Sequence, residues 1–403
     1  MSNVIVVGGG AAGMMAAIFA ARNGQNVTLL EKNEKLGKKI FITGKGRCNI
    51  TNASEIEDLF SAVISNPKFL YSGFYSFTND QVIHFFEELG VATKIERGNR
   101  VFPVSDHSSD VIAALAREMQ HLKVKVQLHC EVKELLINNE REIKGVRLAN
   151  GKKMTADAVV VATGGISYPS TGSTGDGYRF ARNCGHKVTE LFPSLVPMEV
   201  KEWYAKELQG LSLKNIEIHI TDGKKKLYDE FGEMLFTHFG VSGPLVLSAS
   251  AYVKKSTYRL EIDLKPALDD KKLDARLLRD FGEQHTKQIS TVMRGLLPQA
   301  MVDPVLDKAG VAVDTRISEI TKVQRAAIVN ALKHFDLTVT GLRPIEEAII
   351  TDGGVSLKEL DPKTMGSKLI DGLYFAGEII DCAAYTGGYN LQIAFSTAHS
   401  AAT

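Results

Sequence analysis

The apolar positions at the start of the chain predict a strand, a helix and a second strand. Val4–Val7 form an uninterrupted apolar run, and residues 11–23 then combine small and apolar side chains before Gly24. A continuous apolar run is typical of a strand covered on both faces, and a glycine after the last helical residue is a common helix end. A second apolar run, Val27–Leu30, follows directly. The pattern therefore predicts a β-α-β unit.

The alternation of helical and strand patterns continues to about residue 165. The expected elements are helices at residues 55–89 and 109–121 and strands at residues 124–129, 131–137, 143–149 and 158–162. The last of these strands is again a continuous apolar run, and it leads into Thr163-Gly164-Gly165. A similar run, Leu373–Ala376, leads into Gly377 and Glu378 near the end of the chain.

The middle of the chain differs from both ends, and this difference predicts a domain organisation. Short alternating segments with glycine and proline predict β structure from residue 191 onward, whereas the pattern becomes helical after Leu264. The β/α style returns after Gly341. The predicted domains are an α/β domain of residues 1–190 and 342–403, a β-rich substrate domain of residues 191–265 and 336–341, and a helical domain of residues 266–335.

Composition narrows the functional classes. A net charge of +1 over 403 residues gives no electrostatic reason to expect nucleic acid or an anionic membrane as a partner. The start of the chain lacks the basic residues of a signal peptide, and we find no apolar stretch of transmembrane length, so we expect a cytoplasmic protein. The four cysteines are scattered without a C-x-x-C pair, which predicts free reduced thiols. We expect no metal, because His and Cys do not cluster at ligand spacing.

The turn after the first strand carries the pattern G-x-G-x-x-G as Gly8, Gly10 and Gly13. The first glycine permits a tight turn, the second lets the backbone approach a pyrophosphate, and the third lets the helix pack close to the strand. The helix N-terminus would then point its unpaired N–H groups at the phosphates. Glu31, at the end of the second strand, has the spacing expected for a hydrogen bond to a ribose hydroxyl. The segment predicts a bound dinucleotide.

The first motif does not separate FAD from NAD, but two later strands favour FAD. Ala162-Thr163-Gly164 ends one apolar strand, Gly377-Glu378 ends another, and a helix is predicted from Tyr389. This trio resembles the two-dinucleotide-binding flavoprotein superfamily, and the resemblance implies that the last helix points its N-terminus at the flavin ring. Such a helix would stabilise the negative charge of a reduced flavin. We find no second G-x-G-x-x-G to hold NAD(P)H, since Gly172–Gly177 has the wrong order and predicts a loop.

Three longer segments resemble the YhiN/BaiN-like family of bacterial FAD-dependent oxidoreductases, which includes bacterial aminoacetone oxidase. They are Lys38–Asn52, Phe236–Pro244 and Thr386–Thr397. The resemblance covers essentially the whole chain and implies a Rossmann-like FAD-binding domain, an inserted β-barrel-like domain and a small helical domain. The chain departs from the family at Thr43 and Lys45, where serine and glycine are usual, and at Cys382–Tyr385. Lys45 adds a cation near the expected flavin loop, so the substrate preference stays open.

The motifs and the resemblance together give a set of expected cofactor contacts. These are Gly8, Gly10, Ala11, Ala12, Gly13, Glu31, Lys32, Lys39, Thr43, Gly44, Gly46, Arg47, Cys48, Asn49, Val132, Ala162, Thr163, Gly164, Gly377, Glu378, Gly388, Tyr389, Asn390 and Leu391. Arg47 and Asn49 are expected to contact the flavin or its phosphates, whereas Cys48 is expected to be a small buried side chain rather than a redox thiol. His238 and Tyr389 are the candidate catalytic residues. The alternatives are a satisfied core histidine and a packing tyrosine.

Known members of the family are functionally diverse, so the resemblance implies a cofactor and a reaction type rather than a substrate. We expect a hydride to move between a substrate carbon and flavin N5. One version oxidises a small amine of the aminoacetone type with O2 and releases H2O2. A second uses NAD(P)H to reduce a C=C bond in a steroid-like or RNA uridine substrate, with the helical domain as a recognition platform. A non-catalytic flavin sensor is the alternative from another class.

Overall fold

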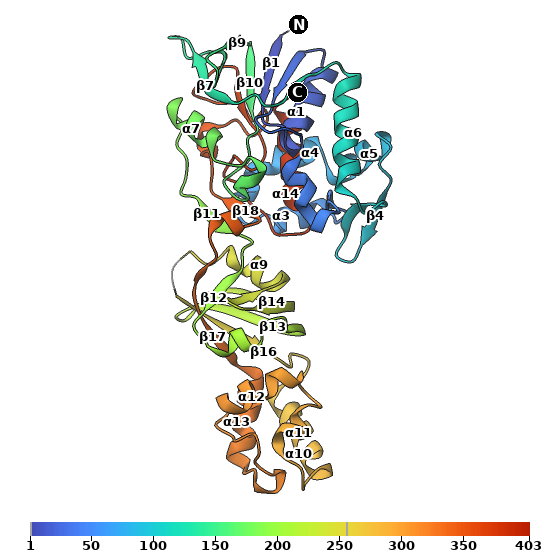
Figure 1. Cartoon of the computed structure of the whole chain (residues 1–403), viewed down its shortest axis with the longest axis vertical. Coiled ribbons are helices and arrows are strands. Elements are labelled where there is room, and N and C mark those ends of the chain that lie inside the picture. The colour runs from blue at the N-terminus through green and yellow to red at the C-terminus, as the bar shows by residue number, and fades with distance from the viewer. Residues whose placement is uncertain (1, 255–256) are drawn as a thin grey trace. The chain divides into compact units, whose positions relative to one another are not determined.

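The computed structural model describes residues 2–254 and 257–403, which form two compact units (Figure 1). The first unit contains the chain up to Ser194 together with Pro344–Thr403, and the second is Leu195–Arg343. Both ends of the chain therefore belong to one unit, as the return of the β/α pattern suggests. Residues 1, 255 and 256, which fall inside two of the predicted domain ranges, lie outside the described residues.

A five-stranded parallel sheet forms the centre of the first unit, in the order β19-β10-β1-β2-β6. Its strands are β1 (Asn3–Val7), β2 (Asn26–Leu30), β6 (Lys125–Gln127), β10 (Ala158–Val161) and β19 (Leu373–Phe375). Val4–Val7 pair in register with Val27–Leu30 on one side and with Ala158–Val161 on the other. Helix α1 (Ala11–Arg22) packs against β1, β2 and β10, so these apolar runs are buried. The Rossmann-type α/β prediction is confirmed.

The other α-helices of the first unit range from five to 14 residues in length. They are α2 (Lys38–Ile42), α3 (Ile56–Ser61), α4 (Tyr71–Ser76), α5 (Asn79–Glu88), α6 (Ser108–His121), α7 (Asp176–Asn183) and α14 (Tyr389–Ser400). The helical pattern at residues 55–89 is broken because Asn66 adopts a left-handed conformation directly before Pro67, which lacks an N–H group. Within the described chain, we find no helix that is both long and apolar enough to cross a membrane.

Three smaller antiparallel sheets complete the first unit. Their strands are β3 (Thr51–Asn52), β4 (Thr93–Glu96) and β5 (Arg100–Pro103), then β7 (Val132–Ile137), β8 (Ile143–Leu148) and β9 (Lys153–Thr155), and finally β11 (Phe192–Ser194) and β18 (Ile350–Asp352). Strand β11 ends at Ser194, where the chain leaves the first unit, and β18 begins at Ile350, shortly after the chain returns to it. Ser194 and Ile350 are aligned with each other in this pair of strands.

A closed antiparallel barrel lies in the second unit, in the order β12-β15-β14-β13-β16-β17. Its strands are β12 (Met198–Val200), β13 (Ser212–Asp222), β14 (Lys225–Thr237), β15 (Gly240–Ser242), β16 (Tyr258–Asp263) and β17 (Phe335–Leu342). Alternate side chains such as Ile218 and Ile220 on β13 are fully buried, which matches the two-residue period of the sequence. Two short helices, α8 (Tyr204–Glu207) and α9 (Pro244–Ser250), pack on the barrel strands. The β-barrel-like prediction is confirmed.

The described chain between β16 and β17 forms four α-helices. They are α10 (Asp270–Glu283), α11 (Ile289–Met293), α12 (Gln299–Lys308) and α13 (Lys322–Lys333). Their apolar side chains, including Leu273 and Leu332, belong to the same buried cluster as the barrel residues Leu260 and Ile262. The second compact unit therefore contains both the barrel and the helices. The separate helical domain of residues 266–335, and the boundaries of all three predicted domains, stay a prediction.

His399, in the last turn of α14, makes the stability of the first unit depend on pH. Its ring stacks on Phe77 at 4.9 Å between centroids and meets Phe19 edge-on, and burial lowers its pKa. The unfolded chain therefore binds the proton more tightly. The contribution of the neutral His399 ring to the free energy of unfolding is complete above about pH 6.5. This contribution is lost as the pH falls toward the lowered pKa of the folded state.

We expect His399→Phe to reduce the loss of unfolding free energy between about pH 8 and about pH 5, measured by urea denaturation, because the variant removes the protonation site and keeps a ring. The exposed His84 provides the control, and His84→Gln should leave the loss unchanged. An unchanged loss in His399→Phe would contradict the assignment.

Candidate functional site

Close backbone contacts shape the turn between β1 and α1. A Cβ at Gly8, where φ is +108°, would lie 2.5 Å from the Ala162 carbonyl oxygen, and a Cβ at Gly13 would lie 1.8 Å from the Gly8 oxygen. Gly10 differs, because no described atom lies within 4 Å of a Cβ built there. Gly10 is also the N-cap of α1, whose first turn holds no acidic residue. The open space therefore lies beside unpaired N–H groups, which is the arrangement a phosphate needs.

Glu31 directly follows β2 and is 7% exposed. Its Oε2 accepts a hydrogen bond from the Gly9 N–H at 2.6 Å, and its Oε1 accepts one from the Asn33 N–H at 2.8 Å. The carboxylate thus fixes the glycine turn to the segment after β2. The next residue, Lys32, pairs with Asp176 at 2.7 Å. Contact of Glu31 with a ribose stays a prediction, and its position next to the turn supports it.

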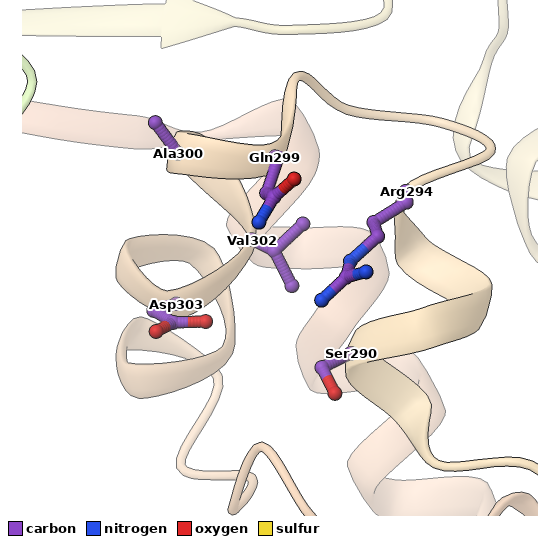
Figure 2. Close-up of a pocket in the computed structure, with 6 residues that line it drawn as sticks. All are labelled: Ser290, Arg294, Gln299, Ala300, Val302 and Asp303. Carbon is purple, nitrogen blue, oxygen red and sulfur yellow. The ribbon is translucent and has the colours of Figure 1, made fainter.

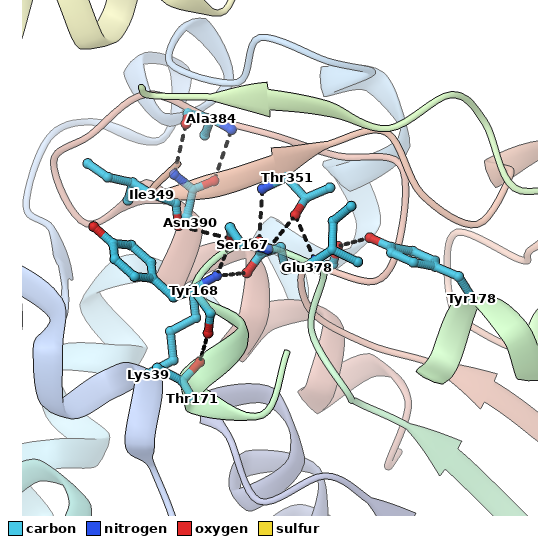
Figure 3. Close-up of polar contacts among 11 residues, drawn as sticks. Lys39, Ser167, Tyr168, Thr171, Tyr178, Ile349, Thr351, Glu378, Ala384 and Asn390 are labelled. Atoms are coloured by element: carbon cyan, nitrogen blue, oxygen red, sulfur yellow. Dashed lines mark hydrogen bonds and ion pairs between the residues drawn. The ribbon is translucent and has the colours of Figure 1, made fainter. Parts of the chain in front are cut away.

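Glu378 is the centre of a polar network that joins four distant parts of the first unit (Figure 3). Its Oε2 pairs with the Lys39 ammonium at 2.7 Å, and its Oε1 accepts from the Ser167 hydroxyl at 3.0 Å and from the Thr351 N–H at 2.9 Å. Lys39 also donates to the Ser167 hydroxyl at 2.7 Å. The predicted cofactor residues Lys39 and Glu378 are therefore brought together, and each restrains the other.

Ser167 and Thr351 complete this network and were not among the predicted site residues. The Thr351 hydroxyl accepts from the Ile166 N–H at 2.9 Å and from the Ser167 N–H at 3.2 Å, so it holds the segment after β10 in place. Both residues lie far from Lys39 and Glu378 in the sequence, and neither belongs to a recognised motif. We know of no local signal in the sequence that identifies them.

The start of α14 is held by the strand that follows the glycine-rich loop. Gly388 packs so closely that a Cβ there would lie 2.3 Å from the Thr51 carbonyl oxygen, and the Asn52 amide donates to the Gly387 oxygen at 3.1 Å. The Asn390 side chain donates to the Ala384 oxygen at 2.8 Å and accepts from its N–H at 3.0 Å. The Asn390 side chain therefore shapes the chain before the helix. The backbone N–H groups of the first turn, which includes Leu391, stay available to a ligand.

The loop that contains Arg47 and Cys48 resembles its family motif but gives the two side chains different surroundings. The Arg47 guanidinium pairs with Glu96 and with Asp106 and lies over the Phe102 ring. These carboxylates raise the Arg47 pKa, and the contact of Arg47 with the flavin or its phosphates stays a prediction. Cys48 is fully buried, as we expected, and burial raises the pKa of its thiol to about 12. Its role toward the cofactor stays a prediction. All four cysteines are free thiols.

The segment after β10 and the start of β7 hold further cofactor candidates. The Ala162 oxygen and Thr163 Cα lie against Gly8, and Gly164 has a φ of +70°. The Thr163 hydroxyl is buried with no hydrogen-bond partner among the described residues. Val132, at the start of β7, is 4% exposed. The glycine turn and the A-T-G strand end therefore form one continuous surface.

These elements follow one another in the order of the parts of FAD. Glu31 lies beside the glycine turn and the N-terminus of α1. Gly377 comes next, because a Cβ there would lie 2.7 Å from the Ala12 Cβ and 3.8 Å from the Ala394 Cβ of α14. The α14 N-terminus follows, beside the loop that carries Asn49, whose Oδ1 is buried with no hydrogen-bond partner among the described residues. The unpartnered atoms and the space at Gly10 fit a ligand with a diphosphate at one point and a ring farther along. FAD fits these residues.

The two candidate catalytic residues lie in different units. Tyr389 is the first residue of α14 and is half-buried, and burial raises its pKa, so its hydroxyl keeps its proton at neutral pH. His238 is exposed in the turn between β14 and β15, where its ring meets Phe239 edge-on. The core-histidine alternative for His238 is therefore wrong. A catalytic role stays a prediction for both residues.

Two further groups of polar side chains lie in the second unit. A pocket of about 250 Å³ between α11 and α12, into which Arg294 points, is lined by Ser290, Arg294, Gln299, Ala300, Val302 and Asp303 (Figure 2). On the barrel, β13 and β14 bring the ligand atoms of Glu217, His219 and Asp229 within 4.8 Å of one another. His219 pairs with Asp229 at 2.8 Å, and Asp229 also pairs with Lys226. The described residues of these two groups include none of the predicted cofactor contacts.

Comparison with known proteins identifies relatives along the whole chain. A family profile described as "HI0933-like protein Rossmann domain" matches residues 2–403. The chain is 31% identical over 409 residues to a 3-dehydro-bile acid delta(4,6)-reductase from Clostridium scindens, covering 100% of this chain and 98% of the relative. It is 32% identical over 402 residues to a ribosomal RNA dihydrouridine synthase from Haemophilus influenzae, with the same coverage of 100% and 98%.

Solved structures show the same fold. The crystal structure of 3-ketosteroid delta1-dehydrogenase from Sterolibacterium denitrificans, in complex with 1,4-androstadiene-3,17-dione, superposes with a TM-score of 0.54 at 14% identity. The match covers 100% of this chain and 99% of that chain. At this identity the likeness supports the architecture alone.

The different surroundings of Gly10 and Gly13 give a direct test of the cofactor site. We expect Gly10→Ala to leave the thermal unfolding of the apoprotein unchanged, because its Cβ meets open space, but to weaken FAD binding at least about tenfold by crowding the diphosphate. Fluorescence titration of the apoprotein with FAD measures this affinity.

Gly13→Ala is the matched variant, because its Cβ would strike the Gly8 oxygen and should lower the unfolding temperature of the apoprotein itself. Full FAD affinity in Gly10→Ala would contradict the placement of the diphosphate.

Proposed function

Because this chain belongs to the HI0933-like family of Rossmann-domain proteins and is an FAD-dependent oxidoreductase, we propose that it reduces a C=C bond conjugated with a carbonyl group. The proposal rests on one observation. Two relatives match this chain over nearly their whole length, and both of their names describe a reaction of this kind. One name describes a 3-oxo steroid with double bonds at positions 4 and 6. The other describes uridine whose C5–C6 bond, conjugated with the C4 carbonyl, has been saturated.

The residues of the site can support such a reduction. When bound, FAD would supply the two-electron chemistry, taking electrons from a reductant and passing a hydride to the β-carbon of the substrate. The α14 N-terminus, held by Thr51 and Asn52, would stabilise negative charge at the ring. The ion pair of Lys39 with Glu378 would keep both side chains fixed beside bound FAD. We assign to the Tyr389 hydroxyl the donation of a proton to the α-carbon of the substrate.

The reductant and the size of the substrate are the finer parts of the proposal. We take NAD(P)H as the electron donor, binding transiently, since the sequence carries no second dinucleotide motif. The conjugated bond can belong to a small steroid-like molecule or to a uridine in RNA. The near-neutral net charge favours the small molecule, because RNA binding depends strongly on cationic surface. Neither relative reported above is an amine oxidase, so the aminoacetone version rests on the resemblance alone.

Separating the two half-reactions tests the proposed function. We expect NADPH or NADH to bleach the flavin anaerobically, and a 4-en-3-one steroid to restore its colour faster than buffer does, as followed by stopped-flow absorbance. A uridine-containing RNA oligonucleotide is the second probe, and reoxidation by it alone would assign the RNA substrate. Peroxide release with aminoacetone, together with no reoxidation by either probe, would overturn the proposal in favour of the amine oxidase.

A pair of single substitutions tests the proton donor. We expect Tyr389→Phe to slow reoxidation by the enone at least about 100-fold, because general acid catalysis commonly contributes this much, while flavin reduction by NAD(P)H stays within about twofold. His238→Gln is the competing variant and should leave reoxidation near the wild-type rate. The reverse result, with His238→Gln impaired and Tyr389→Phe active, would transfer the role to His238.

A further inference from the structure

Three side chains on the outer face of the barrel bring metal-ligating atoms together. Glu217, His219 and Asp229 each offer one ligand atom, and these atoms all lie within 4.8 Å of one another. Ile218, between the first two, is fully buried. Because side chains alternate along a strand, Glu217 and His219 share the opposite, outer face of β13. Asp229 of β14 is aligned directly with His219, so its carboxylate lies on the same face.

The register of the hairpin formed by β13 and β14 creates this group. The pairing shifts by one residue at Leu227 of β14, which forms a bulge. Without this extra residue, Tyr228 rather than Asp229 would be aligned with His219. The contact between the carboxylate and the imidazole therefore depends on the folded hairpin, and the spacing of these residues along the sequence does not reveal it.

Glu217 differs from its neighbours on the same face in its lack of a cation. It makes no hydrogen bond and no ion pair with any residue that the structure describes. Asp263, aligned with Glu217 on β16, pairs instead with Lys333 at 2.6 Å. His219 pairs with Asp229 at 2.8 Å, and their side chains are 25% and 32% exposed. The group is therefore open to an ion from solvent, and Glu217 supplies a carboxylate that is available to bind it.

We propose that Glu217, His219 and Asp229 bind one Zn²⁺ ion. One imidazole nitrogen with two carboxylate oxygens is a donor set that suits zinc, whereas Mg²⁺ and Ca²⁺ take oxygen ligands. Tetrahedral zinc with bonds of about 2.1 Å holds its ligand atoms about 3.4 Å apart. Rotation of the Glu217 side chain can bring the group to this spacing, and water takes the fourth position. Zinc at this site does not depend on the proposed function, because the expected cofactor contacts all lie in the first unit.

Calorimetric titration with ZnCl2 tests the site in the full-length protein as purified, after a chelator has removed bound metal. We expect the wild type to bind one Zn²⁺ per chain. His219→Gln and Glu217→Gln each remove a ligand and keep a polar side chain, so each should weaken binding at least about tenfold. Titration with MgCl2 should show no binding, because this ion requires oxygen ligands in place of the imidazole.

Two further variants separate a specific site from a damaged fold and from general attraction to the surface. Lys226→Ala removes the cation that pairs with Asp229, so it should tighten Zn²⁺ binding about threefold or more, which a damaged fold would not do. His334→Gln is the matched control. This histidine pairs with Glu261 of β16 at 2.9 Å and does not belong to the group, so its loss should leave the affinity unchanged.

The contrary outcomes are equally specific. Less than one Zn²⁺ per chain, or the same affinity in the wild type and in His219→Gln, would identify an adventitious ion only and overturn the site. Weakening of the same size in His334→Gln, or weaker binding in Lys226→Ala, would also overturn it. Similar affinities for Zn²⁺ and Mg²⁺ would show that the carboxylates attract cations without selecting zinc, which contradicts the proposed donor set.

Discussion

The contact of α1 with the end of β1 is the constraint on which the rest of the cofactor site depends. No side chain fits between Gly13 and the Gly8 carbonyl oxygen, and none fits between Gly8 and Ala162. Because the helix can approach this closely, its N-terminus lies at the turn rather than above it. Gly377 then fits between Ala12 of α1 and Ala394 of α14. A larger distance between Gly13 and the Gly8 oxygen would move the N-termini of α1 and α14 away from one another and from the ligand.

The sequence predicts the first unit well because its determinants are local. Continuous apolar runs mark the central strands β1, β2, β10 and β19, and the glycine motif needs only neighbouring residues to be recognised. The two-residue period of β13 and β16 likewise predicts β structure, whereas the barrel was implied by the family resemblance. The helical pattern at residues 55–89 is also correct in type, although the break at Asn66-Pro67 divides it, and the sequence pattern does not give the helix ends.

The polar network and the surroundings of single side chains could not be predicted in the same way. Lys39 and Glu378 are separated by 339 positions, and Lys39 and Ser167 by 128, so their contact depends on the complete fold. The motif that contains Arg47 gives no sign of the carboxylates of Glu96 and Asp106, which come from the β4–β5 region and occupy its guanidinium. His238 was equally ambiguous. An imidazole between two phenylalanines is typical of a core, yet the chain turns there and leaves it exposed.

The pairing of β11 with β18 has a consequence for the history of the chain. The segment that forms the barrel and its helices leaves the first unit after Ser194 and returns before Ile350, and these two residues are already partners in an antiparallel ribbon. A tight hairpin could close the same ribbon without the inserted segment. The architecture is therefore compatible with an ancestor in which a simple loop connected these strands, and in which a whole folding module was later acquired at that loop without disturbing the Rossmann sheet.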